Sequence, residues 1–455
     1  MSSICYDLST TPKKYREGRH AMSNHIKKML RITDENILVS NVIEKNIRGN
    51  NSLIIKASLT YMPLACINCG STTTDSQGKR VIVKNGSKVV SIRLEPYQHL
   101  PTILELAKQR FHCKNCGDYW TAQTDLVQAK SFISNHTKIK ILDLLSEKIS
   151  MTLIAKLCSV SITTVIRILR SLSTYLPTLT NPVTLPKVLM VDEFRSHASL
   201  EDKMSFICAD GETGKLIDIL PSRKLNKLTQ YFNRTTIESR ENVQFLVTDM
   251  NAAYFQLTKK VFPSAKLIID RFHIVKHLNS AFNEFRVREM KRIDQQNKKS
   301  DANKLKSNWK FLLKNSSNID TTHYKTWRSF RSPKYPFLTE AMMIDRLLSL
   351  SIPLADAYES FQLLGHHFRT KNPEGFFSLL KNLPDNLDPQ FKKKIENLLS
   401  YEEGITNSLI YSYSNGKIEA KNTHIKTLKR VSYGFKSFQN MRIRIFLTNG
   451  LIKIK

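Results

Sequence analysis

The stretch VLMVDEF, residues 188–194, is a short apolar run, rich in β-branched residues, that carries Asp192 near its end. A run of this length and composition is typical of a buried strand. A carboxylate at the edge of such a strand is costly to desolvate unless it is used. The stretch therefore predicts a strand that presents a functional acid.

Two later stretches carry acids in comparable settings. VQFLVTDMNAAY, residues 243–254, is a second buried-strand pattern and contains Asp249; SNGKIEAKNTHIKTLKR, residues 414–430, places Glu419 near the start of a basic helix. If these two acids converge with Asp192, their oxygens form a site for two hard divalent cations, Mg²⁺ or Mn²⁺. Such a site predicts phosphoryl transfer on a nucleic acid.

The charge of the chain indicates a polyanionic partner. Among 455 residues, 70 Lys and Arg stand against 39 Asp and Glu, a net charge of +31. This excess is larger than solubility requires and favours binding to DNA or RNA over a merely solvated surface. A basic membrane-surface protein is the competing interpretation, but we find no apolar stretch of transmembrane length and no signal-peptide core. The length predicts roughly two to four domains.

Four of the seven cysteines form two tight pairs, in CINCG at residues 66–70 and CKNCG at residues 113–117. Two intervening residues let both sulfurs of a turn face one ion, and the following glycine permits the left-handed turn that closes it. A redox dithiol would need only one such pair. The pattern predicts a closed, structural Zn²⁺ site in a reducing, cytoplasmic protein. Its ligands are Cys66, Cys69, Cys113 and Cys116, whereas Cys5, Cys158 and Cys208 are expected to be packing or free residues.

Between the two pairs, RVIVKNGSKVVSIRLEP at residues 80–96 alternates apolar and polar side chains around Asn85-Gly86. This pattern predicts a β-hairpin. We therefore expect a zinc ribbon over residues 56–125, preceded by an N-terminal segment over residues 1–55. A module of this size folds poorly without its metal.

A helix-turn-helix is predicted over residues 130–180. MTLIAKLC is followed by a break at 159–161 and a second helical pattern, in which Ser161 can cap the helix. The polar positions of the second helix suit a DNA major groove. A packing or dimerisation hairpin is the alternative. The candidate DNA-binding residues are Thr163, Thr164, Arg167 and Arg170.

The segment that begins at residue 188 predicts the order strand, strand, strand, helix, strand, helix, strand. MSFICAD (204–210) and KLIDILP (215–221) flank the turn residues DGETG, as antiparallel neighbours do. Three antiparallel strands followed by β/α alternation is the order of the ribonuclease-H-like fold, in which the first and fourth strands are neighbours. The expected fold is a multidomain α/β protein with such a core, a helical insertion, a zinc ribbon and a helix-turn-helix.

With these motifs the sequence resembles insertion-sequence transposases of the ISL-three type, a DDE family with an N-terminal zinc finger and a helix-turn-helix. The resemblance covers nearly the whole chain from about residue 60. It implies that Asp192, Asp249 and Glu419 match the catalytic triad. The motifs that carry it are CINCG, CKNCG, VDEF at 191–194, VTDMNAAY at 247–254, DRFHIVKHL at 270–278 and SNGKIEAKNTHIKTLKRVSYGF at 414–435.

The sequence contains other acids near these positions. Asp210 precedes a glycine in a hairpin and is expected to be a turn residue, and Glu193 should point to the opposite sheet face from Asp192. Asp270 competes with Asp249 because it also ends a strand, but it ends the fifth strand rather than the fourth. His273, one turn further on, could support the site, contact DNA or simply pack.

The 170 positions between Asp249 and Glu419 exceed any simple loop. We expect a catalytic domain formed by residues 186–270 and 405–455, interrupted by a helical insertion at 271–404. In the last helix, Ile418, Ile425 and Leu428 share a side that is predicted to be buried. The basic residues expected to follow DNA phosphates are Lys426, Lys429 and Arg430.

The function predicted from this sequence is that of a DNA transposase. It would bind the terminal inverted repeats of an insertion sequence and also target DNA. We expect a homodimer that holds both ends of the element, located in the cytoplasm in association with the nucleoid. Asp192, Asp249 and Glu419 would hold two Mg²⁺ or Mn²⁺ ions for strand cleavage and transfer. A catalytically inactive, transposase-derived regulator and a ribonuclease acting on RNA–DNA hybrids are the alternatives.

Overall fold

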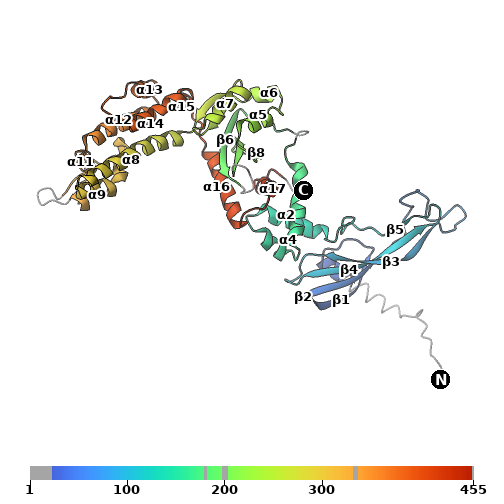
Figure 1. Cartoon of the computed structure of the whole chain (residues 1–455). Coiled ribbons are helices and arrows are strands. Elements are labelled where there is room, and N and C mark those ends of the chain that lie inside the picture. The colour runs from blue at the N-terminus through green and yellow to red at the C-terminus, as the bar shows by residue number, and fades with distance from the viewer. Residues whose placement is uncertain (1–22, 179–181, 197–202, 331–336, 453–455) are drawn as a thin grey trace. The chain divides into compact units, whose positions relative to one another are not determined.

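The chain forms two compact units, unit 1 from Met1–Leu176 with Lys426–Lys455 and unit 2 from Pro177–Ile425 (Figure 1). The computed structural model describes residues 23–178, 182–196, 203–330 and 337–452. Cys5 and the start of the N-terminal segment lie outside these ranges. The mixture of sheets and helices confirms the expected α/β class.

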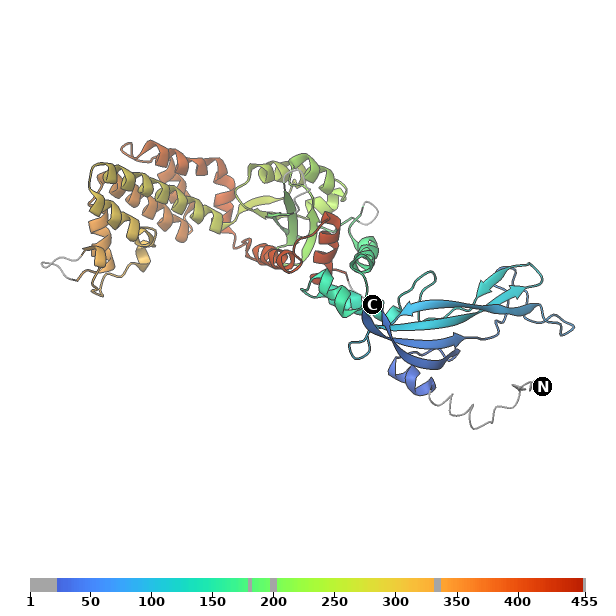
Figure 2. The same cartoon turned by 60° about the horizontal axis from the view of Figure 1, so that its bottom comes forward.

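Unit 1 contains a five-stranded sheet in the order β1-β2-β4-β3, with β5 paired to β4 (Figure 2). The β2–β4 pair is parallel and the others are antiparallel. Apolar side chains such as Ile55 and Leu104 alternate along the strands and form the core of the sheet. The N-terminal segment thus contributes two strands to the sheet that carries the cysteines. The strands are β1 Ile37–Ile47, β2 Asn50–Leu59, β3 Ile82–Arg93, β4 Thr102–Cys113 and β5 Tyr119–Thr121.

The predicted hairpin at residues 80–96 is wrong. Asn85 and Gly86 lie within the single strand β3, where the register with β4 shifts between Lys84 and Ser87. This register shift makes Asn85 and Gly86 a bulge rather than a two-residue turn, and the positive φ of Gly86, +68°, is a conformation that glycine readily adopts. The long antiparallel partner β4 pairs with both halves of β3, which a local pattern could not reveal.

The helical part of unit 1 consists of α2 (Asn135–Ser146), α3 (Met151–Leu157), α4 (Ile162–Ser171) and α17 (Phe438–Thr448). Ser161 caps α4 as predicted, because its hydroxyl accepts the amide N–H of Thr164 at 3.2 Å. The last helix, α17, packs against α2 and α4. The C-terminus of the chain therefore stabilises helices that precede it by almost 300 residues.

Arg444 of α17 is fully buried and joins these helices. Its guanidinium donates to the carbonyl oxygens of Glu147 and Ile149, at 2.7 and 2.9 Å, just beyond the end of α2. Burial lowers the pKa of Arg444 to about 10. A cation near the carboxyl end of a helix satisfies carbonyls that have no partner within the helix.

Unit 2 is built on a five-stranded sheet in the order β10-β9-β6-β7-β8. The β6–β7 and β7–β8 pairs are antiparallel, and the β6–β9 and β9–β10 pairs are parallel. The observed order of elements matches the expected one, with one extra short helix, α6. The strands are β6 Val188–Arg195, β7 Met204–Asp210, β8 Leu216–Leu220, β9 Phe245–Thr248 and β10 Lys266–Ile269.

Three helices, α5 (Leu225–Phe232), α6 (Ile237–Glu241) and α7 (Ala252–Val261), accompany this sheet. Buried side chains of α5 and α7, such as Phe232 and Tyr254, pack with those of β6 and β7 into one core. This core holds the carboxyl ends of the parallel strands in place.

A second hydrophobic core in unit 2 is formed mainly by helices and includes Ile269, the last residue of β10. Figure 1 shows α8, α9, α11, α12, α13, α14 and α15 gathered into one bundle. Helix α15 returns against β10 at Gly404, where any added Cβ would lie 2.8 Å from Ile269, so only glycine permits this approach. The helix α16 (Gly416–Val431) follows. The helical elements are α8 Arg271–Gln295, α9 Lys299–Ser307, α10 Trp309–Leu312, α11 Glu340–Leu348, α12 Ile352–Arg369, α13 Pro373–Lys381, α14 Pro389–Glu396 and α15 Glu402–Ile410.

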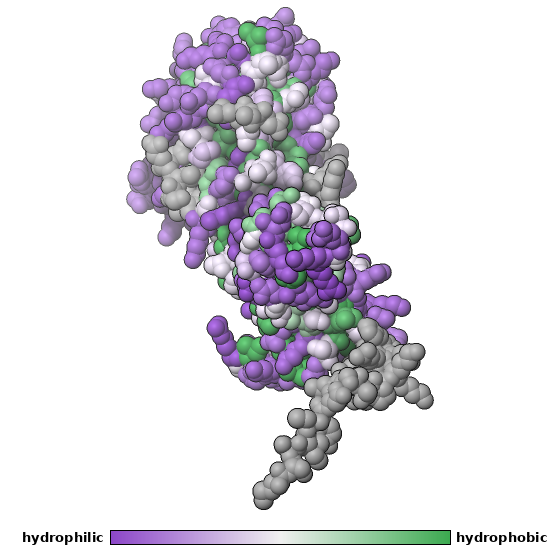
Figure 3. Space-filling view, turned by 90° about the vertical axis from the view of Figure 1, so that its right-hand side faces the viewer, coloured by the Kyte–Doolittle hydropathy of each residue, from purple (hydrophilic) through white to green (hydrophobic). Residues whose placement is uncertain are grey.

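Hydrophilic residues cover most of the face seen in Figure 3, with hydrophobic ones in scattered patches. Within the described ranges no single helix is long and apolar enough to cross a bilayer. Met151–Leu157 and Ile162–Tyr175, bent by 108° to one another, pass that test only as a pair and only by length and composition.

Candidate functional site

The four paired cysteines converge in unit 1. Their sulfur atoms all lie within 4.8 Å of one another. The Sγ atoms of Cys66 and Cys116 are 3.6 Å apart, and those of Cys69 and Cys113 are 3.7 Å apart. A tetrahedral ion with Zn–S bonds of about 2.3 Å holds its sulfurs about 3.8 Å apart. The cluster therefore has the shape of a closed zinc site, as predicted.

The turns around the cysteines follow the predicted chemistry. Gly70 and Gly117 have φ values of +72° and +76°, and their amides donate to the carbonyls of the first cysteine of each pair. The pKa of Cys69 is lowered to about 6, chiefly by hydrogen bonds with Ser71. The amide of Asp118 lowers the pKa of Cys116, but desolvation and the neighbouring thiols raise it to about 12 overall. Crowded thiols cannot all ionise without a cation, and a bound metal removes that restriction.

The remaining described cysteines fit the expectation of packing residues. Cys158 and Cys208 are both fully buried and form no disulfide. Burial raises the pKa of the Cys158 thiol.

Replacing Cys113 with Ser is expected to release the zinc, about one ion per chain, and to unfold the zinc ribbon. A hydroxyl is a poor substitute for the thiolate ligand, and a module this small depends on its metal. Zinc content measured by a colorimetric chelator, together with the thermal transition, checks this. Cys158→Ser is the control, because that cysteine is equally buried but lies outside the cluster; a Cys113→Ser protein with full zinc and an unchanged transition contradicts the assignment.

The acids of unit 2 meet because of the strand register. Val247 pairs with Met190 on β6, and Thr248 pairs with Ile269 on β10. Extending each register by one or two residues sets Asp192, Asp249 and Asp270 level with one another. Asp249 and Asp270 directly follow the parallel strands β9 and β10, and Asp192 lies level with them within β6. The three acids therefore lie near the carboxyl ends of the parallel strands, where ligands bind in open α/β sheets.

Asp192 is mostly buried and oriented by two donors. The amide N–H of Glu193 donates to its Oδ1 and the side-chain Nδ2 of Asn422 donates to its Oδ2, each at 2.7 Å. Burial raises the pKa of Asp192 to about 6; the carboxylate of Asp249 raises it further, whereas His273 lowers it. A buried carboxylate with a raised pKa is typical of functional sites.

Asp249 has the same electrostatic environment. Its pKa is raised by burial and by the carboxylate of Glu193, and lowered in part by His273. Glu193 itself is neutralised by Arg223, whose Nη1 lies 2.7 Å from both carboxylate oxygens. Asp210 caps its own turn, accepting from the amide of Glu212 at 2.8 Å, and is thus a turn residue as predicted.

Glu419 approaches the site from α16. Its carboxylate, that of Asp270 and a ring nitrogen of His273 all lie within 4.8 Å of one another. In this group Glu419 is joined by Asp270 and His273 rather than by Asp192 and Asp249. His273 is thus adjacent to Glu419 and Asp270 and acts electrostatically on the other two acids.

Two asparagines attach the start of α16 to the strand ends. The amide N–H of Asn415 donates to Oδ1 of Asp270 at 3.2 Å, and its side-chain Nδ2 to the carbonyl of Val191 at 3.4 Å. Asn422, seven residues later and therefore on the same helix face, donates to Asp192. Glu419 lies between them along the helix. The predicted burial of Ile418, Ile425 and Leu428 is confirmed.

Neither Asn415 nor Asn422 is among the site residues predicted from the sequence. Both are almost fully buried. The sequence does contain one signal, the spacing of the asparagines in SNGKIEAKN. Asn415 and Asn422 lie four residues before and three residues after Glu419, so a helix would place all three on one side. What they contact depends on strands more than 140 residues away, so spacing alone could not reveal it.

The residues predicted to bind DNA have varied surroundings. The hydroxyls of Thr163 and Thr164 lie 2.8 and 3.0 Å from the capping hydroxyl of Ser161. Arg167 is exposed, and Nε of Arg170 donates to Asn440 of α17 at 3.0 Å. On α16, Lys426 and Arg430 are exposed and Lys429 is half-buried.

Two family models match parts of the chain. Residues 189–445, more than half of the chain, match the family of transposases of the ISL3 type. Residues 63–116, which include all four clustered cysteines, match the zinc finger of the transposases of IS204, IS1001, IS1096 and IS1165. The chain belongs to the ISL3 family of transposases.

Two curated relatives are similar over parts of the chain. The transposase for insertion sequence element IS1001 of Bordetella parapertussis is 21% identical over 258 residues, 56% of this chain and 59% of that protein. A protein named ATP-dependent protease from Lactococcus lactis subsp. lactis is 33% identical over 138 residues, 30% of this chain and 43% of that protein. The matches thus cover about half the length of each relative.

Proposed function

We propose that this protein cleaves DNA at the ends of an insertion sequence and joins those ends to target DNA, using Asp192, Asp249 and Glu419 as its catalytic acids. The observation that carries the proposal is the meeting of acids at the ends of neighbouring parallel strands, with Glu419 of α16 brought to the same edge. Membership of a transposase family supports this reaction class.

The catalytic core is proposed to be ribonuclease-H-like. In support, three antiparallel strands are followed by two parallel strands, and the first strand, β6, lies beside the fourth, β9. The α8–α15 segment, with its own hydrophobic core, fits the proposed insertion at residues 271–404. The proposed catalytic domain then consists of residues 186–270 with the returning segment from residue 405.

The donor set suits a hard divalent cation. Its oxygens come from carboxylates whose pKa values are raised by burial, which is the state that a bound cation relieves. Mg²⁺ or Mn²⁺ held by Asp192, Asp249 and Glu419 would supply an activated oxygen nucleophile and neutralise charge on the phosphodiester.

The protein side chains have their own proposed roles. Asn422 holds the carboxylate of Asp192 in one orientation by donating to Oδ2. Arg223 pairs with Glu193 and so limits the negative charge beside Asp249. Asn415 ties Asp270 and the end of β6 to the start of α16, which positions Glu419. These hydrogen bonds and this ion pair would fix the orientation of the acidic side chains before the substrate binds.

Double-stranded DNA is the proposed partner, in the form of terminal inverted repeats and target DNA. The net charge of +31 supports this, as does the 108° bend between α3 and α4, which suits a helix-turn-helix. Thr163, Thr164, Arg167 and Arg170 are proposed to contact the groove. Lys426, Lys429 and Arg430 are proposed to contact phosphates. We further propose that the protein acts as a homodimer that holds the two ends of the element. Its proposed location is the cytoplasm, in association with the nucleoid.

A supercoiled-plasmid assay tests this function. Purified protein with Mg²⁺ or Mn²⁺ is expected to convert plasmids that carry the element's ends to nicked circles, and to leave them intact in EDTA. DNA binding without nicking in either metal contradicts the enzyme and supports a transposase-derived regulator. Cleavage of RNA–DNA hybrids but not of duplex DNA points to a ribonuclease. The sequence has no G-x-x-x-x-G-K-[ST] phosphate loop of the kind that ATPases use.

A further inference from the structure

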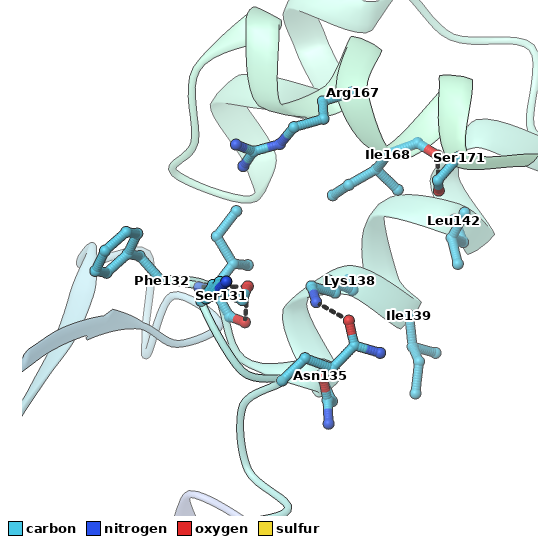
Figure 4. A pocket seen from close by; sticks show the side chains of 12 residues that line it. Ser131, Phe132, Asn135, Lys138, Ile139, Leu142, Arg167, Ile168 and Ser171 are labelled. Carbon is cyan, nitrogen blue, oxygen red and sulfur yellow. Dashed lines mark hydrogen bonds between the residues drawn. The ribbon is translucent and has the colours of Figure 1, made fainter. Parts of the chain in front are cut away.

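A pocket of about 640 Å³ opens in unit 1 beside the proposed recognition helix α4 (Figure 4). One wall is the loop that connects the zinc-bearing sheet to α2, and the others are the faces of α2 and α4. Its lining includes none of the four clustered cysteines. The residues that carry the argument are Lys130, Phe132, Lys138, Ile139 and Arg167.

The loop holds an aromatic ring out in solvent at this pocket. The amide of Arg93 donates to the carbonyl of Phe132, and the amide of Ser134 donates to the carbonyl of Arg93, each at 2.9 Å. These bonds fix the backbone so that Ile133 is buried, at 5% exposed, whereas Phe132 is 65% exposed. Ile139, also on the pocket wall, is 48% exposed. The pocket thus has a preformed apolar surface with nothing covering it among the described residues.

The charged groups of this pocket are cations. Lys130, Lys138 and Arg167 line it, and the lining residues that the structure describes include no Asp or Glu. Lys138 donates to the neutral side chain of Gln128 at 2.7 Å. Burial lowers the pKa of Lys138 and the charge of Arg167 lowers it further, so the two cations repel each other across the pocket. An anion between them would remove that repulsion.

We propose that this pocket binds one nucleotide of DNA, with its phosphate between Lys138 and Arg167 and its base stacked on Phe132. An aromatic face combined with cations recognises any base together with its backbone phosphate, which a simple anion site does not do. An unstacked base is required, so the ligand is a single-stranded or locally opened nucleotide. The proposal rests on the proposed function in one respect only, namely that the protein handles DNA.

Two fluorescein-labelled probes test the stacking. One is a 15-nucleotide strand of thymidines, and the other is a 15-mer of abasic phosphates with the same charge and no bases. The full-length, zinc-loaded protein is expected to bind the thymidine strand more tightly. Phe132→Ala should weaken thymidine binding roughly 5- to 100-fold and leave abasic binding unchanged. Phe132→Tyr should retain the preference, and Phe337→Ala, which removes an equally exposed ring elsewhere, should change nothing.

The phosphate contact is tested by salt. Lys138→Gln is expected to reduce the slope of log affinity against log salt by about 0.7 for both probes, because one fewer counterion is released. Lys304→Gln is the control, since Lys304 is already paired with Asp301 at 2.8 Å. Zinc content and the thermal transition establish that each variant is folded.

Specific outcomes overturn the proposal. Equal wild-type affinity for the two probes, or a Phe132→Ala protein that keeps the preference for thymidines, excludes base stacking here. Poly-glutamate serves as a third probe, a polyanion without bases. If Phe132→Ala weakens the binding of poly-glutamate and of thymidines equally, the pocket is a general anion site and the proposal is wrong. These binding results do not depend on plasmid nicking. A protein that fails to nick DNA but still prefers the thymidine strand would contradict the proposed enzyme and support the proposed nucleotide pocket.

Discussion

Replacing Asp192 with Ala is expected to reduce metal-dependent nicking of supercoiled plasmid by roughly a thousandfold or more, with DNA binding largely retained. Asp192 lies within the central strand β6 (Val188–Arg195), level with Asp249, which directly follows β9, and is oriented by Asn422. Removal of its carboxylate takes away one of the three groups that would hold the divalent cations. The loss of nicked product in a time course, set against unchanged binding in a gel shift, is the measurement.

Asp210→Ala is the matched control for this prediction. Asp210 ends the adjacent strand β7 but serves its own turn, so nicking should persist at close to the wild-type rate. Wild-type nicking by Asp192→Ala would show that the proposed site is not the catalytic one.

The same residue gives a stability signature in EDTA. Because the folded-state pKa of Asp192 is raised to about 6, the folded protein retains a proton that the unfolded chain releases between about pH 4 and pH 6. Stability therefore falls as pH rises through this window, and the penalty is fully present at pH 8. Asp192→Asn removes the penalty and is expected to stabilise the metal-free protein by on the order of 1–3 kcal/mol at pH 8 but little at pH 4. Urea titrations at the two pH values measure this.

The second large effect separates Asp249 from Asp270. Asp249→Asn and Asp249→Ala are both expected to abolish nicking, because a neutral amide cannot replace the proposed ligand. Asp270→Ala should also impair nicking, since it removes the acceptor for the amide of Asn415. Asp270→Asn keeps that acceptor and should restore most of the activity. Nicking rates of the four variants under saturating Mg²⁺ are compared.

The opposite pattern would reassign the second acid. If both Asp270 variants are inactive while Asp249→Asn nicks normally, then Asp270 is the ligand, and the group it forms with His273 and Glu419 is the metal site. We favour Asp249 because it follows β9, the strand next to β6, whereas Asp270 follows β10, which is separated from β6 by β9.

Local patterns predicted the features whose cause is local. Two residues between paired cysteines, followed by glycine, predicted the turns that bring four sulfurs together. Ser161 before a helical pattern predicted the cap of α4, and apolar runs predicted β6 and β9. Each depends on the geometry of a few consecutive residues, which the side chains there determine.

Features that depend on distant partners could not be predicted in this way. Asn85-Gly86 is a strong hairpin signal, yet it became a bulge because β4 offered a longer partner. The burial of Arg444 depends on where α2 ends, and the α17 pattern alone does not reveal this. The donation from Asn422 to Asp192 joins residues 230 positions apart.

The sequence by itself determined the zinc module, the strands that end in acids and the basic helix that carries Glu419, because each is written in local spacing and periodicity. Only the tertiary structure decided that β9 and β10 set Asp249 and Asp270 level beside β6, and that Glu419 forms one group with Asp270 and His273. It also brought Phe132, Lys138 and Arg167 to the lining of one pocket. The physical reason is that strand pairing and helix packing join segments that are distant in the sequence. They depend on the burial of the whole hydrophobic core, and each segment contributes only part of that core.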